Sequence, residues 1–271
     1  MNINQNEEHL SAYEKAAKEG IDPRCIPQKL TGNVPIHDEI IYPSYTDDEH
    51  EVWKFLYNRQ MGFLPNRAAN EYLEGVEKLK LSSDRIPYLK DISNVFYETT
   101  GWRVARVPGL IDVEDFFRLI SERIFPSTDY IRKREELDYT PAPDLFHDIF
   151  GHMPMLTNTS FANFYQKFGI ASLRANPADR KQLETLHWFT VEFGLIKNEI
   201  GTRIYGAGVL SSLGEVQHAL SDEVEVREFD VEKIIVQEYD VWHLQPILFA
   251  IESFEQLEQG FDDWCKKKGL L

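Results

Sequence analysis

The sequence predicts a mainly α-helical fold: a single domain of packed helices with a few short β-strands. Many segments repeat apolar residues at the spacing of an amphipathic helix, whereas segments that alternate apolar and polar residues are few and short. The regular succession of strand and helix that marks a parallel α/β sheet is absent from the pattern. With 271 residues, of which 42% are hydrophobic, the chain can bury a large core in one domain.

The N-terminal part differs in composition from the rest. Residues 1–20 are polar and acidic, and we expect them to be frayed or weakly helical. Residues 21–46 contain four prolines, which favour extended chain over helix. We therefore expect residues 1–45 to form an extended segment that packs on a domain comprising residues 46–271.

Helical patterns begin after Thr46, whose hydroxyl can cap a helix with acids in its first turn. A later helix is expected to stop at Gly101, because glycine is the usual residue just past a helix end. In order, the first half of the domain is expected to hold helices at 47–60, 66–81 and 88–101, a short strand at 102–107, and an amphipathic helix at 112–125 with Phe116, Leu119 and Ile120 facing the core.

The second half continues in helices. Lysines at the end of the last expected helix suit the negative end of its dipole. In order, we expect helices at 160–173 and 178–197, a glycine-rich loop followed by a helix at 206–220, a strand at 223–230, and a terminal helix within 245–269.

Composition disfavours several classes of partner. The formal net charge is −16, so nucleic acid or an anionic membrane would have to meet a local basic patch, and the best candidate, residues 131–136, runs directly into acids. No apolar run approaches the length of a membrane span, and the N-terminus lacks a signal-peptide pattern. Cys25 and Cys265 form no CxxC pair. We expect a cytoplasmic protein that binds neither nucleic acid nor membrane.

Two histidines stand out in "PDLFHDIFGHMP", residues 143–154. His147 and His152 are five residues apart, which is about 140° around an ideal helix, so their rings would point to different sides. They can converge only if the helix ends or distorts between them, and Gly151 and Pro154 favour an end there. A metal site and a helix end that merely holds two histidines both remain possible readings at this point.

Glu192 is the third notable residue, because its neighbours in "HWFTVEFGL" are apolar. A buried carboxylate must meet a cation, be protonated or bind a metal, and a lysine or arginine is its more common partner. Two neutral imidazoles and one carboxylate can occupy one face of an octahedral metal, as in non-haem iron(II) oxygenases. The same ligands on zinc would instead activate water, and spacing alone does not decide between the metals.

Five separate motifs give this chain a specific family resemblance over roughly residues 85–260. It resembles the pterin-dependent aromatic amino acid hydroxylases, and among them the bacterial phenylalanine 4-hydroxylases. Nothing corresponds to the regulatory domain or tetramerisation helix of animal members, so we expect a monomer or dimer. The motifs are "YTPAPDLFHDIFGHMPML", "SFANFYQKFGIASL", "HWFTVEFGL", "YGAGVLSSLGE" and "LQPILFAIESF".

The resemblance implies a role for individual residues around iron and substrate. His147, His152 and Glu192 would bind Fe2+. An arginine that grips the substrate carboxylate agrees with the geometry of the guanidinium fork. The implied substrate-binding residues are Arg132, supported by Thr140 and Asp144; Trp188, which would pack the aromatic ring; Ser211, a hydroxyl beside an iron-bound histidine; and Val241, where tyrosine hydroxylases carry Asp.

For the reduced pterin, tetrahydrobiopterin or a relative, the resemblance implies Gly109, Ile111, Phe116 and Asp148. Phe116 would stack on the pterin ring, although by its pattern alone it is a core residue. Asp148 stands where animal members tend to carry Glu, which leaves its contact open. His187 and His218 are expected to be structural or surface residues, although His187 occupies a position where relatives often carry Tyr beside the site.

The implied function is an iron- and tetrahydropterin-dependent monooxygenase that converts L-phenylalanine to L-tyrosine with O2. Trp188 and the apolar Val241 favour phenylalanine among the aromatic amino acids. The alternatives are tryptophan or tyrosine as main substrate, a zinc hydrolase with the same three ligands, and a polar cluster in a non-enzymatic protein. The expected partners are therefore small molecules: an aromatic amino acid, O2 and a reduced pterin.

Overall fold

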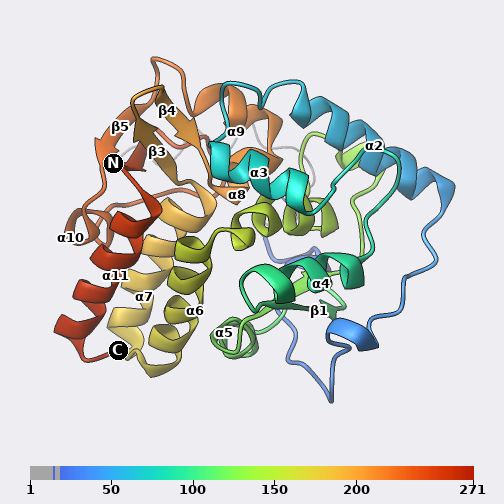
Figure 1. Ribbon diagram of the computed structural model, residues 1–271, viewed down its shortest axis with the longest axis horizontal. Helices are drawn as coiled ribbons and strands as arrows, with labels where there is room; N and C mark the ends of the chain where they lie inside the picture. The colour runs from blue at the N-terminus through green and yellow to red at the C-terminus, as the bar shows by residue number, and fades with distance from the viewer. Residues whose placement is uncertain (1–14, 16–18) are drawn as a thin grey trace.

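The computed structural model describes residue 15 and residues 19–271, and helices dominate this part of the chain (Figure 1). Most of the residues expected to be frayed, 1–20, lie outside the described residues. Residues 21–45 run mainly as extended chain with two 3-10 turns, Pro23–Cys25 and His37–Glu39. Single β-bridges join Gln28 to Ile111 and Ile36 to Ala105, so this segment lies against the following domain.

The first three helices follow the predicted pattern. α2 (Asp47–Met61) begins at Thr46, whose backbone N–H donates to Glu49 Oε2 at 2.7 Å while its hydroxyl accepts from the Glu49 N–H at 3.3 Å. This reciprocal pair is a capping box. α3 (Asn70–Lys78) and α4 (Leu89–Thr99) follow, and Gly101 just past α4 adopts a left-handed φ of 74°. The predicted helix stop is therefore confirmed.

A small β-α-β unit follows α4. β1 (Arg103–Val107) pairs in parallel with β2 (Ile124–Thr128), and α5 (Val113–Ser121) connects them. The predicted helix at 112–125 is too long, because α5 ends at Ser121 and residues 124–128 form the strand β2. All five of its residues are buried, so no alternation marks them as a strand, and the expected absence of a parallel unit is wrong here.

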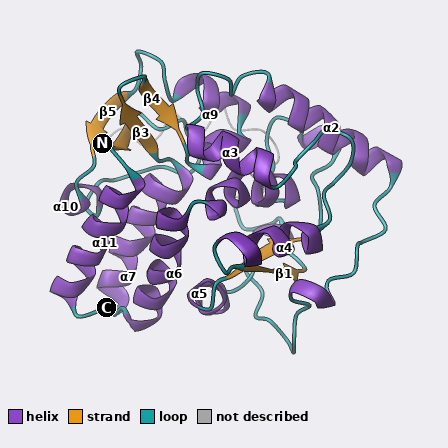
Figure 2. Cartoon of the chain, in the orientation of Figure 1, coloured by secondary structure: helices purple, strands orange, loops and turns teal. Residues whose placement is uncertain are grey.

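Most of the second half of the chain is helical. Figure 2 shows helices through most of the chain and strands gathered in two small groups, and α6, α7 and α11 lie side by side (Figure 1). No helix in the described part of the chain is long and apolar enough to cross a bilayer. The bounds are Arg134–Glu136 and Met153–Thr157 (3-10), His147–His152 and Trp188–Glu192 (π), α6 Thr159–Arg174, α7 Pro177–His187, α8 Ala207–Ser211, α9 Leu213–His218, α10 Val231–Ile234 and α11 Phe254–Lys268.

The second sheet has the strand order β4-β3-β6-β5. β5 (Glu225–Glu228) confirms a predicted strand, and β4 (Gly201–Ile204) pairs antiparallel with β3. β3 (Leu195–Asn198) was expected to be the end of a helix, and β6 (Ile247–Ile251) to lie within the terminal helix. β6 is an inner strand, buried over four of its five residues, so its apolar run lacks the period of a half-exposed strand.

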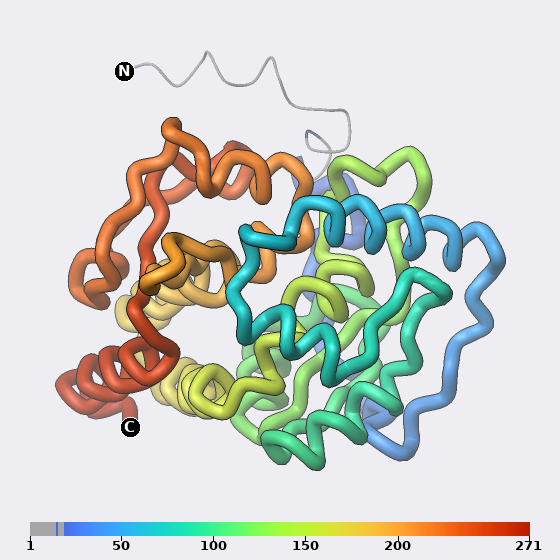
Figure 3. Tube along the Cα trace, turned by 45° about the horizontal axis from the view of Figure 1, so that its top comes forward, coloured from blue at the N-terminus to red at the C-terminus, as the bar shows by residue number. Residues whose placement is uncertain are grey.

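α3 supports the segment that follows His152. It packs on the turn Met153–Thr157, near the middle of the molecule (Figure 3). A Cβ at Gly75 would lie 2.2 Å from the carbonyl oxygen of Pro154, which is a backbone atom. The close approach of α3 to this turn therefore requires glycine at position 75.

We expect Gly75→Ala to lower the free energy of unfolding by about 1–3 kcal/mol, because the added methyl must push two backbone segments apart. Urea unfolding measures the change. Gly214→Ala is the matched control, since a Cβ there meets only a Leu244 methyl at 3.7 Å. Equal stability of the two variants would contradict the close contact between α3 and Pro154.

Candidate metal centre and its cavities

His147 and His152 open and close a π-helical turn, and this turn brings their rings together. The N–H of Met153 donates to the carbonyl of Asp148, five residues back, which is the bond of a π-helix. A π turn places residues five apart on one face, so the two Nε2 atoms lie 2.9 Å from each other. The expected convergence is present, but the helix widens between the histidines where the sequence favoured an end.

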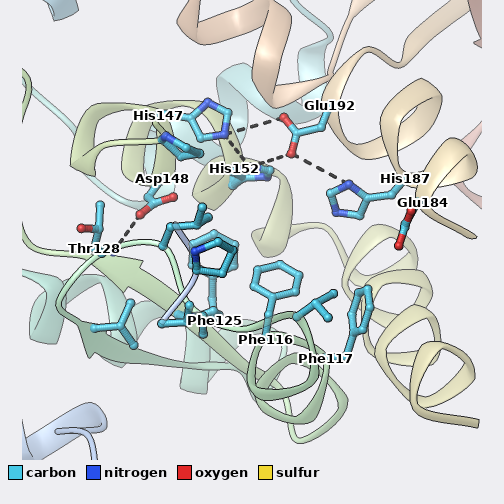
Figure 4. Close-up of a pocket in the computed structure, with 18 of the residues that line it drawn as sticks. Phe116, Phe117, Phe125, Thr128, His147, Asp148, His152, Glu184, His187 and Glu192 are labelled. Atoms are coloured by element: carbon cyan, nitrogen blue, oxygen red, sulfur yellow. Dashed lines mark hydrogen bonds and ion pairs between the residues drawn. The ribbon is translucent and has the colours of Figure 1, made fainter. Parts of the chain in front are cut away.

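Glu192 reaches the same point from a second π turn, Trp188–Glu192, in which the N–H of Phe193 donates to the carbonyl of Trp188 at 2.8 Å. Its Oε1 lies 3.3 Å from His152 Nε2, and its Oε2 lies 3.7 Å from His147 Nε2. The three ligand atoms lie within 4.8 Å of one another (Figure 4). The structure therefore brings together the three predicted ligands.

The spacing of these atoms fits a divalent metal. Ligand atoms bound at about 2.1 Å on adjacent corners of an octahedron lie about 3 Å apart. The observed separations of 2.9, 3.3 and 3.7 Å are close to this value. Two imidazoles and one carboxylate on one side of a cavity would leave the remaining corners open.

Ser211 fixes the orientation of the His147 ring. The Ser211 hydroxyl donates to the carbonyl of Ala207 at 2.8 Å, so it accepts from His147 Nδ1 at 2.9 Å. Nδ1 then carries the proton and Nε2 presents its lone pair to the site. An outer hydrogen bond of this kind is usual for a metal-bound histidine.

The ionisation of the cluster also suits a cation. Burial, with a smaller contribution from His152, lowers the pKa of His147 to about 4. For Glu192, burial alone would raise the pKa, but the neighbouring His152 outweighs it and the pKa lies below its usual range. At neutral pH Glu192 is therefore a carboxylate and His147 a neutral imidazole, the states in which these groups bind metal. Burial alone would lower the pKa of His152, but the Glu192 carboxylate outweighs burial and raises it, so a metal would have to displace a proton there.

Two cavities meet at this cluster. The first has a volume of about 500 Å³, and the second about 620 Å³. Both are lined by Pro143, His147, His187, Trp188, Glu192 and Val241. A molecule in either cavity would therefore lie beside His147 and Glu192, and a molecule in the first cavity would also lie beside His152.

The first cavity is lined by all four residues that the resemblance implies as pterin-binding. Phe116 lies below the histidines and Glu192 in Figure 4, half-buried against the core. Asp148 accepts a hydrogen bond from the Thr128 N–H at 2.8 Å, and burial raises its pKa to about 7. Gly109 and Ile111 complete the set.

The second cavity contains Arg132, Thr140 and Ser211. Arg132 donates from Nε and Nη2 to Asp144 at 2.9 and 2.8 Å, and Asp144 is fully buried. Asp144 therefore holds the guanidinium in place from behind, while Nη1 takes no part in the pair. Thr140 donates to the Ala142 carbonyl at 2.9 Å, which closes the loop beside it.

Trp188 lies between the cavities. Its ring stacks on Phe193 at a centroid distance of 4.4 Å and on Tyr239 at 4.8 Å. Val241 is half exposed and lines both cavities. Aromatic and aliphatic surface therefore faces the metal cluster where the cavities join.

His187 was expected from the sequence to be a structural or surface residue, and Glu215 was not singled out, but both residues line the cavities. His187 Nδ1 lies 4.0 Å from Glu192 Oε1, and its Nε2 lies 3.3 Å from the Tyr165 hydroxyl. The signal was present, because His187 precedes Glu192 by five residues, as His147 precedes His152. Glu215 lines the second cavity, where Oε2 has no hydrogen-bond partner and burial raises the pKa to about 8.

Comparisons with known proteins agree with this geometry. The family described as biopterin-dependent aromatic amino acid hydroxylase matches residues 24–269. Phenylalanine-4-hydroxylase of Pseudomonas aeruginosa is 45% identical over 215 residues, which cover 79% of this chain and 82% of that protein. The apo structure of the cold-active phenylalanine hydroxylase from Colwellia psychrerythraea has a TM-score of 0.82 at 40% identity, covering 87% of this chain and 91% of that chain.

A second solved structure contains ligands. Phenylalanine hydroxylase from Chromobacterium violaceum, with bound iron(III) and oxidised 7,8-dihydrobiopterin, has a TM-score of 0.80 at 38% identity. The match covers 84% of this chain and 85% of that chain.

We expect Ser211→Ala to weaken the binding of a divalent metal by about 10- to 100-fold, because His147 loses the group that fixes its ring. Titration of the purified protein with Fe2+ under anaerobic conditions measures the affinity. Ser160→Ala, on an exposed hydroxyl that bonds Glu255, is the matched control. Unchanged affinity in Ser211→Ala would show that this hydrogen bond does not orient the ligand.

Glu215 is expected to make stability depend on pH. Because its folded pKa of about 8 lies above the ordinary 4.5, the folded protein holds the proton more tightly than the unfolded chain. The resulting stabilisation is full below pH 4.5 and is lost as the pH rises to 8, by at most about 1.4 kcal/mol per pH unit. Glu215→Gln stays neutral, so urea unfolding of this variant should show a flatter pH profile; identical profiles would contradict a buried neutral Glu215.

Proposed function

Because the chain belongs to the family of biopterin-dependent aromatic amino acid hydroxylases, we propose that it is an iron- and tetrahydropterin-dependent monooxygenase that converts L-phenylalanine to L-tyrosine with O2. The observation that carries this proposal is the meeting of His147, His152 and Glu192 at the junction of two cavities. A reaction that joins an amino acid, a pterin and O2 requires such a junction.

We assign Fe2+ to His147, His152 and Glu192. When bound, ferrous iron and a reduced pterin would supply the electrons that reduce O2, so that one of its oxygen atoms could enter the aromatic ring. The chain's own residues orient these partners: Ser211 fixes His147, and the apolar walls keep water away from the ring. His187 lines both cavities beside Glu192 and limits the space around that carboxylate.

The pterin is assigned to the first cavity. Phe116 offers an aromatic face for stacking, and Ile111 and Gly109 line the wall beside it. Asp148 offers a carboxyl group that already accepts one backbone hydrogen bond. A heterocycle that donates N–H groups suits that carboxyl group.

The amino acid is assigned to the second cavity. Nη1 of Arg132 lies outside the pair with Asp144, so it can donate to the substrate carboxylate while the pair keeps the fork in place. Trp188 and the apolar Val241 suit a ring without a hydroxyl. One such contact separates phenylalanine from tyrosine or tryptophan by only about 1–3 kcal/mol, so turnover of the other two is slower but not excluded.

We further propose a cytoplasmic enzyme that acts as a monomer or dimer. Cys25 and Cys265 are both free thiols, which suits a reducing compartment. Light scattering of the purified protein gives the oligomeric state directly, and a tetramer would contradict the proposal.

Incubation with Fe2+, tetrahydropterin, O2 and each aromatic amino acid tests the function. We expect tyrosine from phenylalanine, with consumption of pterin and O2. Glu192→Ala removes one of three metal ligands and should lower turnover by at least about 100-fold, while Glu199→Ala, an exposed acid, should leave it unchanged. Hydrolytic activity with zinc, independent of pterin and O2, would instead identify a hydrolase.

A further inference from the structure

We infer that Arg24 is a positioning residue that ties the amino-acid side of the site to its pterin side. The inference rests on the proposed function. It concerns a bridging segment, residues 22–30, which contacts two loops that lie much further along the chain. One is the substrate loop, residues 132–143, which lines the second cavity. The other, which we call the pterin loop, is residues 109–115, the turn before α5 together with the first residues of that helix, and it lines the first cavity.

Arg24 binds the substrate loop through a two-pronged ion pair. Nη1 and Nη2 donate to the two carboxylate oxygens of Glu136 at 3.0 and 2.6 Å. Asp22 holds the same guanidinium from the other side, at 3.1 Å from Nε and 2.8 Å from Nη2. The planar fork of arginine is thus filled by two carboxylates, an arrangement that lysine cannot reproduce.

Glu136 depends on this partner because its side chain is only 3% exposed. Burial by itself would raise its pKa, but the hydrogen bonds from Arg24 and from the Lys133 N–H outweigh burial and lower it. Glu136 is also four residues from Arg132 in the same loop. Loss of Arg24 would leave a buried anion unpaired, and the loop that carries Arg132 would have to rearrange.

Other residues of the bridging segment also make hydrogen bonds to the two loops: Cys25 to the substrate loop, and Gln28 and Leu30 to the pterin loop. The Cys25 thiol donates to the Pro141 carbonyl at 3.0 Å. The backbone of Gln28 bonds on both sides of Ile111, with its N–H donating to Leu110 and its carbonyl accepting from Asp112 at 2.8 Å. The N–H of Leu30 donates to Asp115 at 2.9 Å, and Pro27 lines the first cavity itself.

Other ties to the substrate loop are weaker. Arg59 pairs with Asp138, whose side chain is 88% exposed, and Arg134 pairs with Asp48, which is 64% exposed. Solvent screens such exposed pairs. Arg132, at the start of the loop, has its own buried pair with Asp144; among the ion pairs that join the rest of the loop to other segments, the pair of Arg24 and Glu136 is the least exposed.

Hydrogen exchange of the ligand-free protein and steady-state kinetics test this role. In Arg24→Met, we expect backbone protection in residues 132–143 to fall about tenfold or more, with a smaller change in residues 109–115, which keep their own bonds to the segment. The KM for phenylalanine should rise about tenfold, while the pterin KM and kcat change less than about threefold. Arg85→Met, at an exposed arginine stacked on Tyr42, is the control.

The double variant Arg24→Met/Glu136→Gln separates positioning from general damage. Because the Glu136→Gln change removes the charge that Arg24 would otherwise balance, we expect the double variant to recover most of the loop's protection and of the phenylalanine KM. The inference is overturned if Arg24→Met matches Arg85→Met in both measurements, or if neutralising Glu136 restores nothing. Failure of the wild-type protein to make tyrosine would contradict the proposed function, while the exchange data would still decide the role of Arg24.

Discussion

The candidate site depends on two π-helical turns. An α-helix turns residues five apart to different sides, whereas the turns His147–His152 and Trp188–Glu192 place such residues on one face. The first turn aligns the two imidazoles, and the second aligns Glu192 with His187. Close packing holds the first turn, since a Cβ at Gly151 would lie 2.9 Å from the Ala207 carbonyl in α8. α8 also contains Ser211, so the helix that packs against this turn also orients the His147 ring.

The fold could be predicted from the sequence where elements are half-buried. α2, with its Thr46 cap, and α4, with its Gly101 stop, present an apolar face and local end signals. β2 and β6 present neither. All of β2 and four of the five residues of β6 are buried, so neither strand alternates between buried and exposed positions. The apolar run of β6, and Ile124 and Phe125 of β2, fit a helix equally well. What makes them strands is their partners: β1, which precedes β2 along the chain, and β3 and β5, which flank β6.

The site shows the same limit at the level of side chains. His147 and His152 were notable for their spacing, and Glu192 was notable because a carboxylate among apolar residues needs a partner. The family resemblance implied that all three bind one metal. Arg24 carried no such signal, since its partner Glu136 lies 112 residues away and both residues read as ordinary surface charges. Glu215 likewise became notable only when α9 placed it against the second cavity. The local sequence can indicate that a charged or titratable side chain needs a partner. Which residue is that partner depends on the tertiary fold.

In the proposed function, the charged residues and the apolar residues of the second cavity have different parts in recognising the amino acid. Arg132 is already neutralised by Asp144, so a substrate carboxylate would meet a preformed pair with Nη1 outside it, and not a bare buried cation. That contact is common to every α-amino acid and cannot separate one from another. Discrimination between aromatic rings would then depend on the apolar lining of the same cavity, where Trp188 stacks on Phe193 and on Tyr239 and Val241 adds an aliphatic wall. In this arrangement Arg132 would set how the amino acid lies, and the apolar residues beside the metal cluster would set which ring is accepted.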